Sequence, residues 1–553
     1  MTNFNVRQDV HPQRKILVIV TVGGSTNSAP ILEICKILHS RGHSIEFATL
    51  AERENLVKPY PFVSAIHTVG RPITKAEEEE FYLRACRWSF SNGQADMMKT
   101  KKFFDSFWTS TYHGLKRVVA ETRPDFIFAD YQVDAARDVM AECNLPLATM
   151  WPQMPWRMLP QPWIPGEPGM QQRCLTSEHA SMWDRLYDET YVLRSARHFL
   201  GYLIWLRKMR RDAGVNYLLP ALKKPNHLLF VNSFFGLEVP KDLPPLVAPV
   251  GPVLADRDDI PPLDADLAMF LGKHTRVLYV AFGTHVILPF ATIQKIAEGI
   301  SMAMRGHHID AVVWAVRATA RTHFDGAATL RVADINMDTE VAITYTELLE
   351  NKHARWKFVD FAPQRAVLEH PATCLFLTHA GPSSANESIF HGVPMIAMGI
   401  YGDQLPNSMR LQEAGVAECV KKETVTAPEL AAKITAVVED VNGLYRRNVV
   451  RMQRVAAVAS RRKELAADLI EEVMYDHELR FECSPHEVEQ DKEGNQGTLG
   501  RGKELRHMHL QTADMRMSWM KARNLDLVLL FLIVFLVFCA VMVLIGLGGA
   551  RVI

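Results

Sequence analysis

Short apolar runs recur along the chain, and most are followed by a small-residue turn and then a helical pattern. Residues 15–22 predict a buried strand, 30–39 predict a helix with its apolar residues on one face, and 44–48 predict a second strand. This order is typical of the opening unit of a doubly wound parallel sheet. The same pattern predicts further strands at residues 125–129, 147–150, 276–281, 311–316, 374–377 and 394–398. The fold class is therefore α/β.

The C-terminal end carries a different pattern. Residues 527–550 form 24 consecutive positions without a charge. At 1.5 Å per residue this run crosses a bilayer core with some tilt, and an uncharged run of this length is unusual for a buried core helix. Arg516, Lys521 and Arg523 precede the run, whereas only Arg551 follows it. This asymmetry predicts that the bulk of the chain faces the cytosol.

The N-terminal end shows no signal peptide, because the first apolar run is short and leads directly into a Gly-rich turn. We therefore predict a single-pass, tail-anchored protein with cytosolic domains, on the endoplasmic reticulum. Composition adds little to this picture. Of the 553 residues, 48% are hydrophobic, and 62 basic residues balance 62 acidic ones, which gives no support for nucleic-acid binding. The eight cysteines form no CxxC pair, so neither a zinc site nor a disulfide framework is predicted.

Candidate chemistry is concentrated between residues 361 and 404. A strand ending in Thr378-His379 is followed by a small-residue turn at Ala380-Gly381-Pro382, and Ser383-Ser384 then open a helix. This arrangement directs backbone N–H groups and the positive end of a helix dipole at an anion. Glu387 lies on the same face one turn further on, where a carboxylate can accept hydrogen bonds from ribose hydroxyls.

A second strand delivers Asp403-Gln404 at its carboxyl end, the edge at which open α/β sheets bind ligands. Taken singly, these residues have ordinary structural interpretations: a structural histidine, serine helix caps and a solvated loop. Their joint spacing over 44 residues favours a nucleotide-sugar site.

This stretch resembles the signature of the UDP-sugar-dependent glycosyltransferases of the GT-B fold, the family of the animal glucuronosyltransferases and the plant and fungal glucosyltransferases. The resemblance implies that Phe361 stacks on uracil, where the family usually has Trp, and that Gln364 binds the base or ribose. It implies that His379, Gly381, Ser383 and Ser384 contact the diphosphate, together with the Thr284 hydroxyl. Glu387 would hold the ribose, and Asp403 and Gln404 the sugar. No metal and no cofactor are expected besides the UDP-sugar substrate.

The resemblance also implies a domain organisation. It gives an N-terminal acceptor-binding Rossmann-like domain (1–240), a Pro-rich linker (241–262) and a C-terminal UDP-sugar-binding Rossmann-like domain (263–450). Helices over 451–480 would return to the first domain, residues 481–524 would form a flexible tether, and residues 525–550 would form the membrane helix. The implied function is transfer of a hexose to a hydroxyl of a lipophilic small molecule.

The expected catalytic base is missing. The family usually has a histidine after the first strand, oriented by an aspartate that corresponds to Asp130, but Asn27 stands at this place. An amide is not a general base near neutral pH. Three hypotheses remain. In the first, Asp130 or His285 takes the proton, or the acceptor is acidic enough to need little help; in the second, a rearranged site serves a different acceptor. In the third, the chain is a catalytically weak or inactive UDP-sugar-binding membrane protein with a regulatory or scaffolding role. Asp130 alone has an equally good interpretation as a helix cap.

Two further segments leave alternatives open. The loop 151–170 is rich in Pro, Trp and Met, which fits either an apolar acceptor-pocket wall or an ordinary surface loop packed by its own side chains. Residues 200–206 are apolar and precede a basic cluster. They fit either a membrane-surface segment or a buried helix with a solvated end, and we favour the buried helix.

Overall fold

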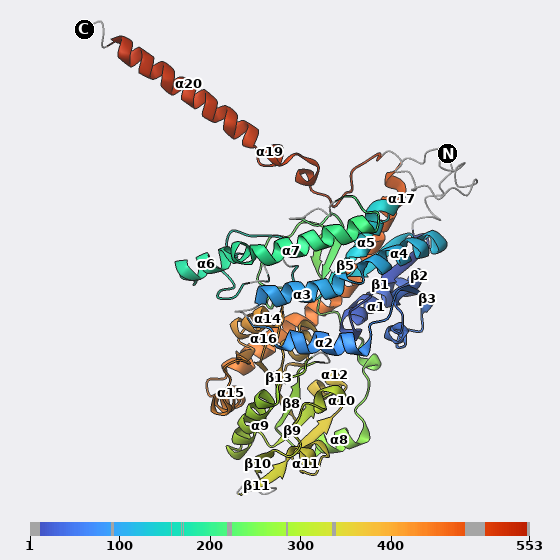
Figure 1. Ribbon diagram of the computed structural model, residues 1–553, viewed down its shortest axis with the longest axis vertical. Coiled ribbons are helices and arrows are strands. Elements are labelled where there is room, and N and C mark those ends of the chain that lie inside the picture. Colours follow the sequence, from blue (N-terminus) through green and yellow to red (C-terminus); the bar gives the residue numbers. More distant parts are fainter. Residues whose placement is uncertain are drawn as a thin grey trace.

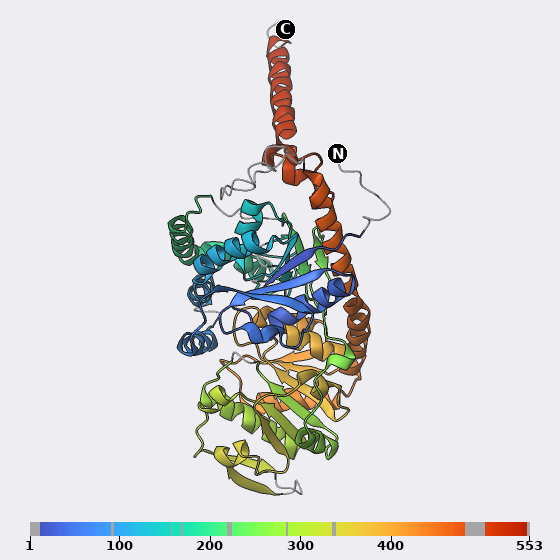
Figure 2. The ribbon, with the colours of Figure 1, turned by 90° about the vertical axis from the view of Figure 1, so that its right-hand side faces the viewer.

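The computed structural model shows two parallel sheets stacked one above the other, with a single long helix projecting from the upper part (Figures 1 and 2). It describes residues 11–89, 93–155, 158–166, 169, 171–217, 224–283, 286–333, 339–481 and 504–549.

The first domain is built on a seven-stranded sheet in the order β3-β2-β1-β4-β5-β6-β7. Its strands are β1 (Lys15–Ile19), β2 (Ser44–Leu50), β3 (Val63–Gly70), β4 (Phe126–Asp130), β5 (Leu147–Trp151), β6 (Leu228–Val231) and β7 (Val247–Pro249). All neighbouring pairs are parallel, with Ile16 between Ile45 and Phe126 in the central register. The carboxyl ends of β1 and β4 therefore reach the same edge of the sheet.

Helices cover both faces of this sheet. They are α1 (Ser25–Ser40), α2 (Lys75–Cys86), α3 (Gly93–Asp105), α4 (Trp108–Thr122), α5 (Asp134–Cys143), α6 (Met182–Glu189) and α7 (Tyr191–Asp212). The apolar face of α1 packs with Ile16 and Val18 on one side, and α4 and α5 pack with Leu17 and Ile19 on the other. The alternation of β1 residues between two cores explains why its sequence is continuously apolar.

The second domain has a six-stranded parallel sheet in the order β12-β9-β8-β13-β14-β15. Its strands are β8 (Val277–Ala281), β9 (Ala311–Ala315), β12 (Trp356–Val359), β13 (Thr373–Thr378), β14 (Met395–Ala397) and β15 (Ala417–Cys419). A separate antiparallel pair is formed by β10 (Thr329–Ala333) and β11 (Glu340–Thr344). The helices are α8 (Ala265–Gly272), α9 (Phe290–Arg305), α10 (Ala318–Arg321), α11 (Tyr345–Leu349), α12 (Gln364–Glu369), α13 (Pro382–His391), α14 (Gln404–Glu413), α15 (Ala427–Glu439) and α16 (Leu444–Ala459).

The last helices of the globular part connect the two domains. The apolar face of α16 joins the core of the second domain through Met452 and Ala456, whereas α17 (Lys463–Arg480) joins the core of the first domain through Ile470 and Val473. Figure 2 shows this pair running along one side of the molecule from the lower domain to the upper one. The chain thus crosses between the domains a second time.

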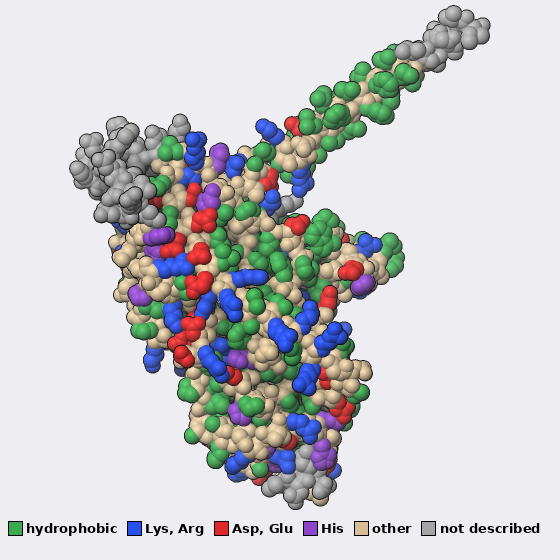
Figure 3. Space-filling view, turned by 180° about the vertical axis from the view of Figure 1, so that it is seen from behind, with side chains coloured by type: hydrophobic (Ala, Val, Ile, Leu, Met, Phe, Trp, Pro, Cys, Tyr) green, Lys and Arg blue, Asp and Glu red, His purple; other side chains and the backbone are tan. Residues whose placement is uncertain are grey.

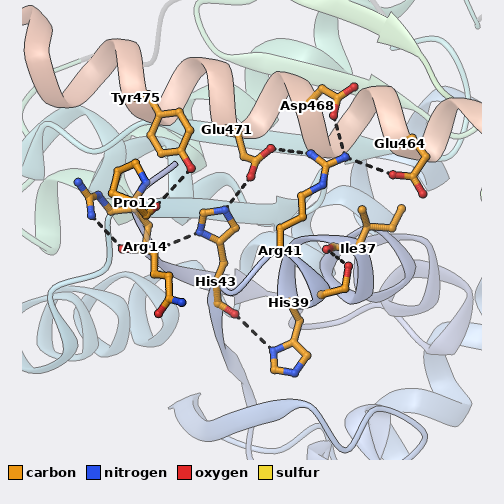
Figure 4. Close-up of polar contacts among 12 residues, drawn as sticks. Pro12, Arg14, Ile37, His39, Arg41, His43, Glu464, Asp468, Glu471 and Tyr475 are labelled. Atoms are coloured by element: carbon orange, nitrogen blue, oxygen red, sulfur yellow. Dashed lines mark hydrogen bonds and ion pairs between the residues drawn. The ribbon is translucent and has the colours of Figure 1, made fainter. Parts of the chain in front are cut away.

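Polar contacts fix α17 on the first domain (Figure 4). The Arg41 guanidinium lies 2.8 Å from Asp468 and 2.5 Å from Glu471, and Glu471 also accepts from the buried His43 ring at 2.9 Å. The hydroxyl of Tyr475 donates to the Pro12 carbonyl at 3.2 Å. These contacts tie the turn after α1 to a helix more than 400 residues later in the chain.

Residues 504–516 do not behave as the flexible tether that the sequence predicted for this region. Met508 is buried in the first core, His509 lies 2.8 Å from Glu472, and Lys224 lies 2.7 Å from Asp514. These contacts hold the segment against the first domain. The remainder of the predicted tether, 482–503, lies outside the described residues.

A helix long and apolar enough to cross a membrane follows this segment. After the short α19 (Trp519–Ala522), α20 (Leu525–Gly549) includes a 20-residue candidate span, Leu525–Leu544, of which no part is buried in the rest of the protein. Figure 1 shows α20 projecting away from the body of the molecule. Its exposed leucines, valines and phenylalanines match a lipid environment better than water.

Candidate functional site

A large cleft lies between the carboxyl edges of the two sheets. Its volume is about 740 Å³, and residues of both domains line it. Predicted site residues that line it are Asn27, Phe361, Gln364, His379, Gly381, Ser383, Ser384, Glu387, Asp403 and Gln404. Thr284 and His285, which the sequence also singled out, lie outside the described residues.

The start of α13 lies in this cleft. Strand β13 ends at Thr378, the turn places Ala380 in the left-handed region with φ +59°, and Gly381 is the N-cap with Pro382 in the first turn. Gly381 has no side chain with which to cap the helix, and the first turn contains no acidic residue. The first backbone N–H groups of a helix have no intrahelical partner, so this end of α13 presents donors and positive dipole to the cleft.

The His379 ring lies between two glycines. A Cβ placed on Gly381 would lie 2.4 Å from His379 Nε2, and a Cβ on Gly283 would lie 2.8 Å from the same atom. Gly283 also has φ +80°, which a residue with a side chain rarely adopts. Both glycines are therefore required to leave room for the imidazole beside the start of α13.

One turn into α13, a carboxylate is held ready to accept hydrogen bonds. Gln364, the first residue of α12, donates from Nε2 to Glu387 at 2.7 Å and to the Ser384 hydroxyl at 3.1 Å. Burial raises the pKa of Glu387, and the Gln364 hydrogen bond opposes this rise. Phe361 stands at the same wall with 69% of its surface exposed, so its ring face is available for stacking.

Asp403 and Gln404 lie at the start of α14, next to β14. Burial raises the pKa of Asp403 to about 6, against the opposing charge of Arg410. The carbonyl oxygen of the Gln404 side chain accepts from the backbone N–H groups of Ile400 at 3.0 Å and Tyr401 at 3.2 Å. These bonds fix the orientation of the Gln404 amide at the cleft wall.

Asn27 and Asp130 meet at the opposite wall, contributed by the first domain. Asn27 lies in the first turn of α1, and its amide nitrogen donates to Asp130 Oδ1 at 3.0 Å. Asp130 ends β4, is 2% exposed and lies behind Asn27. Burial raises its pKa to about 7, and the hydrogen bond from Asn27 opposes this rise. The pairing expected between the residue after the first strand and Asp130 is therefore present, with an amide in place of an imidazole.

The rest of this wall is aromatic. Phe81 of α2 stacks on Phe103 of α3 with ring centroids 4.8 Å apart and meets Phe104 edge-on at 5.2 Å. Trp151 and Met158 from the loop 151–170 also line the cleft, whereas Met154 and Leu159 of the same loop pack on β6 and β7. The loop therefore contributes both to the cleft wall and to the core beside β6 and β7. Trp156, Arg157, Glu167, Pro168 and Met170 lie outside the described residues.

A charged cluster interrupts the apolar wall. Lys101 lies 2.6 Å from Asp105 and 3.0 Å from Asp134, and the Tyr202 hydroxyl donates to Asp105 at 2.5 Å. Both carboxylates raise the pKa of Lys101 and hold it charged, although burial opposes this. The sequence did not reveal this cluster, because its members come from α3, α5 and α7 and meet only in the folded chain.

Buried polar contacts hold the two walls together beneath the cleft. The amide of Asn386 on α13 donates to the Asn232 carbonyl at 2.6 Å. On α14, Arg410 is paired with the buried Glu238 and donates to Gln153 at 2.9 Å. Helices α13 and α14 are thus both fixed to the first domain. Sequence reasoning did not find these residues, because their partners lie more than 150 positions away.

Two parallel-sheet domains that face each other across a cleft form the architecture of the GT-B class. Residues 216–459 match the family model described as UDP-glucoronosyl and UDP-glucosyl transferase. The chain is 50% identical over 533 residues to UDP-glycosyltransferase FPY2 of Fusarium mangiferae, covering 94% of this chain and 96% of that protein. It is 46% identical over 520 residues to UDP-glycosyltransferase stmC of Aspergillus ustus, covering 93% and 94%.

Solved structures show the same fold at low identity. The crystal structure of UDP-glucose: anthocyanidin 3-O-glucosyltransferase in complex with UDP aligns with a TM-score of 0.54 at 18% identity, over 83% of this chain and 99% of that one. The glycotransferase of kitacinnamycin aligns with a TM-score of 0.56 at 18% identity, over 83% and 98%. The fold is GT-B. The chain belongs to the UDP-glycosyltransferase family, whose members transfer a sugar from a UDP-sugar to an acceptor.

Replacing Gly381 by Ala tests the geometry around His379. Gly381 has φ −61°, which alanine adopts without strain, so Gly381→Ala adds only the Cβ that collides with His379. Displacing the ring or the helix start should weaken UDP binding at least about tenfold, the equivalent of one or two lost charge-assisted hydrogen bonds. Calorimetric titration with UDP measures this. Gly272→Ala is the matched control, because a Cβ there meets nothing within 4 Å; equal affinities for the two variants would contradict the geometry.

The raised pKa of Asp130 predicts a pH dependence of stability. Between its ordinary pKa of 3.8 and about 7, the folded chain keeps a proton that the unfolded chain has lost, so stability falls as pH rises through this range. Asp130→Asn keeps the size of the side chain and removes the titration. The stability of the wild type relative to this variant should fall by about 2 kcal/mol between about pH 5 and 7, as read from urea midpoints. Parallel curves for the two proteins would show that Asp130 ionises normally.

Proposed function

We propose that the protein transfers a hexose from a UDP-sugar, without a metal ion, to an acidic hydroxyl of a lipophilic aromatic acceptor. The observation that carries this proposal is the cleft itself. One wall presents a helix start, an imidazole and carboxylates suited to a nucleotide sugar, and the other presents stacked aromatic rings with Asn27 where a base is expected.

The donor occupies the second-domain wall. The backbone amides at the start of α13, the hydroxyls of Ser383 and Ser384 and the His379 ring receive the diphosphate, and these donors stabilise the charge that develops on the leaving UDP. Thr284 adds its hydroxyl to this group. No cation is needed where fixed donors and a helix dipole supply the compensation.

Other residues of the second-domain wall bind the rest of the donor. Phe361 stacks on the uracil, Gln364 binds the base or ribose, and Glu387 accepts from the ribose hydroxyls. Asp403 and Gln404 hold hydroxyls of the hexose at the start of α14, which faces the first domain.

The acceptor occupies the first-domain wall. Rings from α2 and α3, together with Trp151 and Met158, surround flat apolar molecules well, and offset or edge-to-face contacts with aromatic rings add to simple burial. The Lys101 cluster gives this wall a charged position, which orients an oxygen-bearing end of the acceptor.

The proton is the central chemical problem of this site. Asn27 is not a base. Asp130 lies buried behind Asn27, and its Oδ1 accepts a hydrogen bond from the Asn27 amide. Asp130 is therefore a positioning residue, and the acceptor loses its proton to solvent before it attacks. The acceptor oxygen then bonds to the anomeric carbon while the bond from that carbon to the β-phosphate oxygen breaks, and the electron pair leaves with UDP. Phenols and enols ionise readily enough for this route, whereas aliphatic alcohols do not.

The membrane arrangement completes the proposal. The α20 helix anchors the chain in a bilayer, and the basic residues before it keep the two domains on the cytosolic side of the endoplasmic reticulum. A lipophilic acceptor concentrates at such a membrane.

Restoring the base tests the role of Asn27. In Asn27→His the imidazole takes the place of an amide that already lies 3.0 Å from Asp130, so it gains an orienting carboxylate. Turnover of an aliphatic alcohol acceptor should rise by about 10²–10⁴-fold, the usual contribution of a general base, whereas a phenol should gain much less. Product formation with UDP-glucose and UDP-glucuronic acid, measured for both acceptor classes, reads out the difference.

Asn27→Gln is the matched control, because it keeps an amide and should show no gain. The alternative function is that of a UDP-sugar-binding membrane protein with a regulatory role. Intact UDP binding, with no product from any acceptor in either the wild type or Asn27→His, would support this alternative.

A further inference from the structure

Helices α6 and α7 expose an apolar face that the globular fold does not use. Seven large apolar side chains on these two helices are between 49% and 76% exposed: Met182, Trp183, Leu186, Leu193, Leu200, Leu203 and Ile204. We call this set the outer face of α6–α7. Scattered apolar side chains are normal on a protein surface, but a contiguous set on one helix pair marks an interaction surface.

The inner face of α7 packs on α3 and lines the cleft. Tyr191, Phe199 and Tyr202 are buried against α3 and line the cleft on the acceptor side. The prediction of a buried helix over 200–206 is therefore correct for one face of α7 only. Helix α7 thus separates the acceptor end of the cleft from the surroundings of the outer face.

Basic residues accompany the α7 part of the outer face, whereas α6 carries Asp184 and Glu189 beside Arg185. Helix α7 contains Arg194, Arg197, Arg207, Lys208 and Arg211 as exposed residues, and Asp212 at its end is its single acidic residue. Arg210, the remaining basic residue, is buried and paired with Asp138. Apolar and cationic side chains mixed on one exposed helix are typical of helices that lie in the interface of an anionic bilayer, and less so of protein–protein contacts.

The position of α20 indicates which surface this is. The segment 504–516 is docked on the first domain, which also carries α6 and α7, so α20 leaves the globular part at a fixed place. Figure 1 shows α20 leaning toward the side on which α6 projects. Figure 3, seen from behind, shows hydrophobic side chains gathered on this projecting arm beneath α20, with basic side chains nearby.

The segment at the base of α20 has the same character. Trp519 and Met520 are 62% and 46% exposed, and Arg516, Lys521 and Arg523 surround them. Tryptophan beside basic residues is the composition found at the headgroup level of membranes. The base of α20 and the outer face of α6–α7 are thus two surfaces of matching chemistry on one side of one domain.

We propose that the outer face of α6–α7 lies in the headgroup region of the same anionic bilayer that α20 enters, and that the acceptor end of the cleft therefore opens next to the lipid phase. The first domain then has two attachments to the membrane, which fix its orientation. The contact with lipid rests on α20 being a membrane span; the route of the acceptor rests also on the proposed function.

Site-specific photocrosslinking in the full-length protein tests the contact. The photoreactive residue p-benzoyl-phenylalanine is placed at position 200 on the outer face, at position 535 within α20, or at position 458 on α16. Val458 is the matched control, because it is 62% exposed on a helix of the second domain, compared with 60% for Leu200. Each variant is reconstituted into nanodiscs that contain phosphatidylserine, irradiated and analysed by peptide mass spectrometry.

Lipid adducts are expected at positions 200 and 535 and not at 458. Lipid adducts at position 535 alone would show that α20 is in the bilayer and that α6–α7 is not, which would overturn the proposed contact. The absence of lipid adducts at position 535 would show that α20 does not span the bilayer. A protein–protein crosslink at position 200 would show that a second copy covers the outer face. None of these readouts depends on activity, so a failed docking contact is distinguishable from a failed function.

A pair of charge substitutions tests the consequence for the acceptor. In Leu200→Glu/Leu203→Glu, the KM for a bilayer-partitioned acceptor should rise at least about threefold, while kcat and the affinity for UDP stay unchanged, because neither side chain lines the cleft. Val455→Glu/Val458→Glu on α16 is the control. An unchanged KM in the outer-face variant would overturn the proposed route of the acceptor.

Discussion

The uncapped start of α13 is the constraint on which the site depends. The first backbone N–H groups of a helix need partners, and here the N-cap is a glycine, the next residue is a proline and the first turn contains no acidic side chain. Neighbouring residues shape the surroundings of this helix start. Gly283 and Gly381 leave room for the His379 ring, and Asn386 fixes the helix to the first domain. An anion bound in the cleft would supply the partner that these N–H groups lack.

The two domains contribute unequally to the chemistry that follows. In the function that we propose, the second domain binds the donor through many directional contacts, and the first binds the acceptor largely through apolar side chains. Asn27 donates to Asp130 and offers no base. Under this proposal the chain lacks the part of catalysis that a histidine would supply and relies on positioning and on stabilisation of the leaving group. The acidic acceptor that we propose would compensate for this lack.

The sequence predicted the parallel α/β fold, because strands such as β1 and β4 are short apolar runs followed by a turn and a helical pattern. The GT-B class came from the resemblance of residues 361–404 to a known family. The resemblance also implied that Asn27 and Asp130 stand together, and their side chains are in contact in the structure. The sequence did not predict the polar contacts between distant segments. The ring of His43, just after α1, binds Glu471, and residues 504–516, for which the sequence predicted a tether, pack on the first domain. Local pattern carries no information about such partners, nor about which face of α7 would be covered.

The most direct test of the account compares the binding of UDP and uridine to the full-length protein in detergent by titration calorimetry, with a chelator present. If the start of α13 and His379 receive the diphosphate, UDP should bind at least about a hundredfold more tightly than uridine, or about 3 kcal/mol, and the chelator should leave this difference unchanged. Equal affinities for the two ligands, or no binding of UDP, would contradict the account.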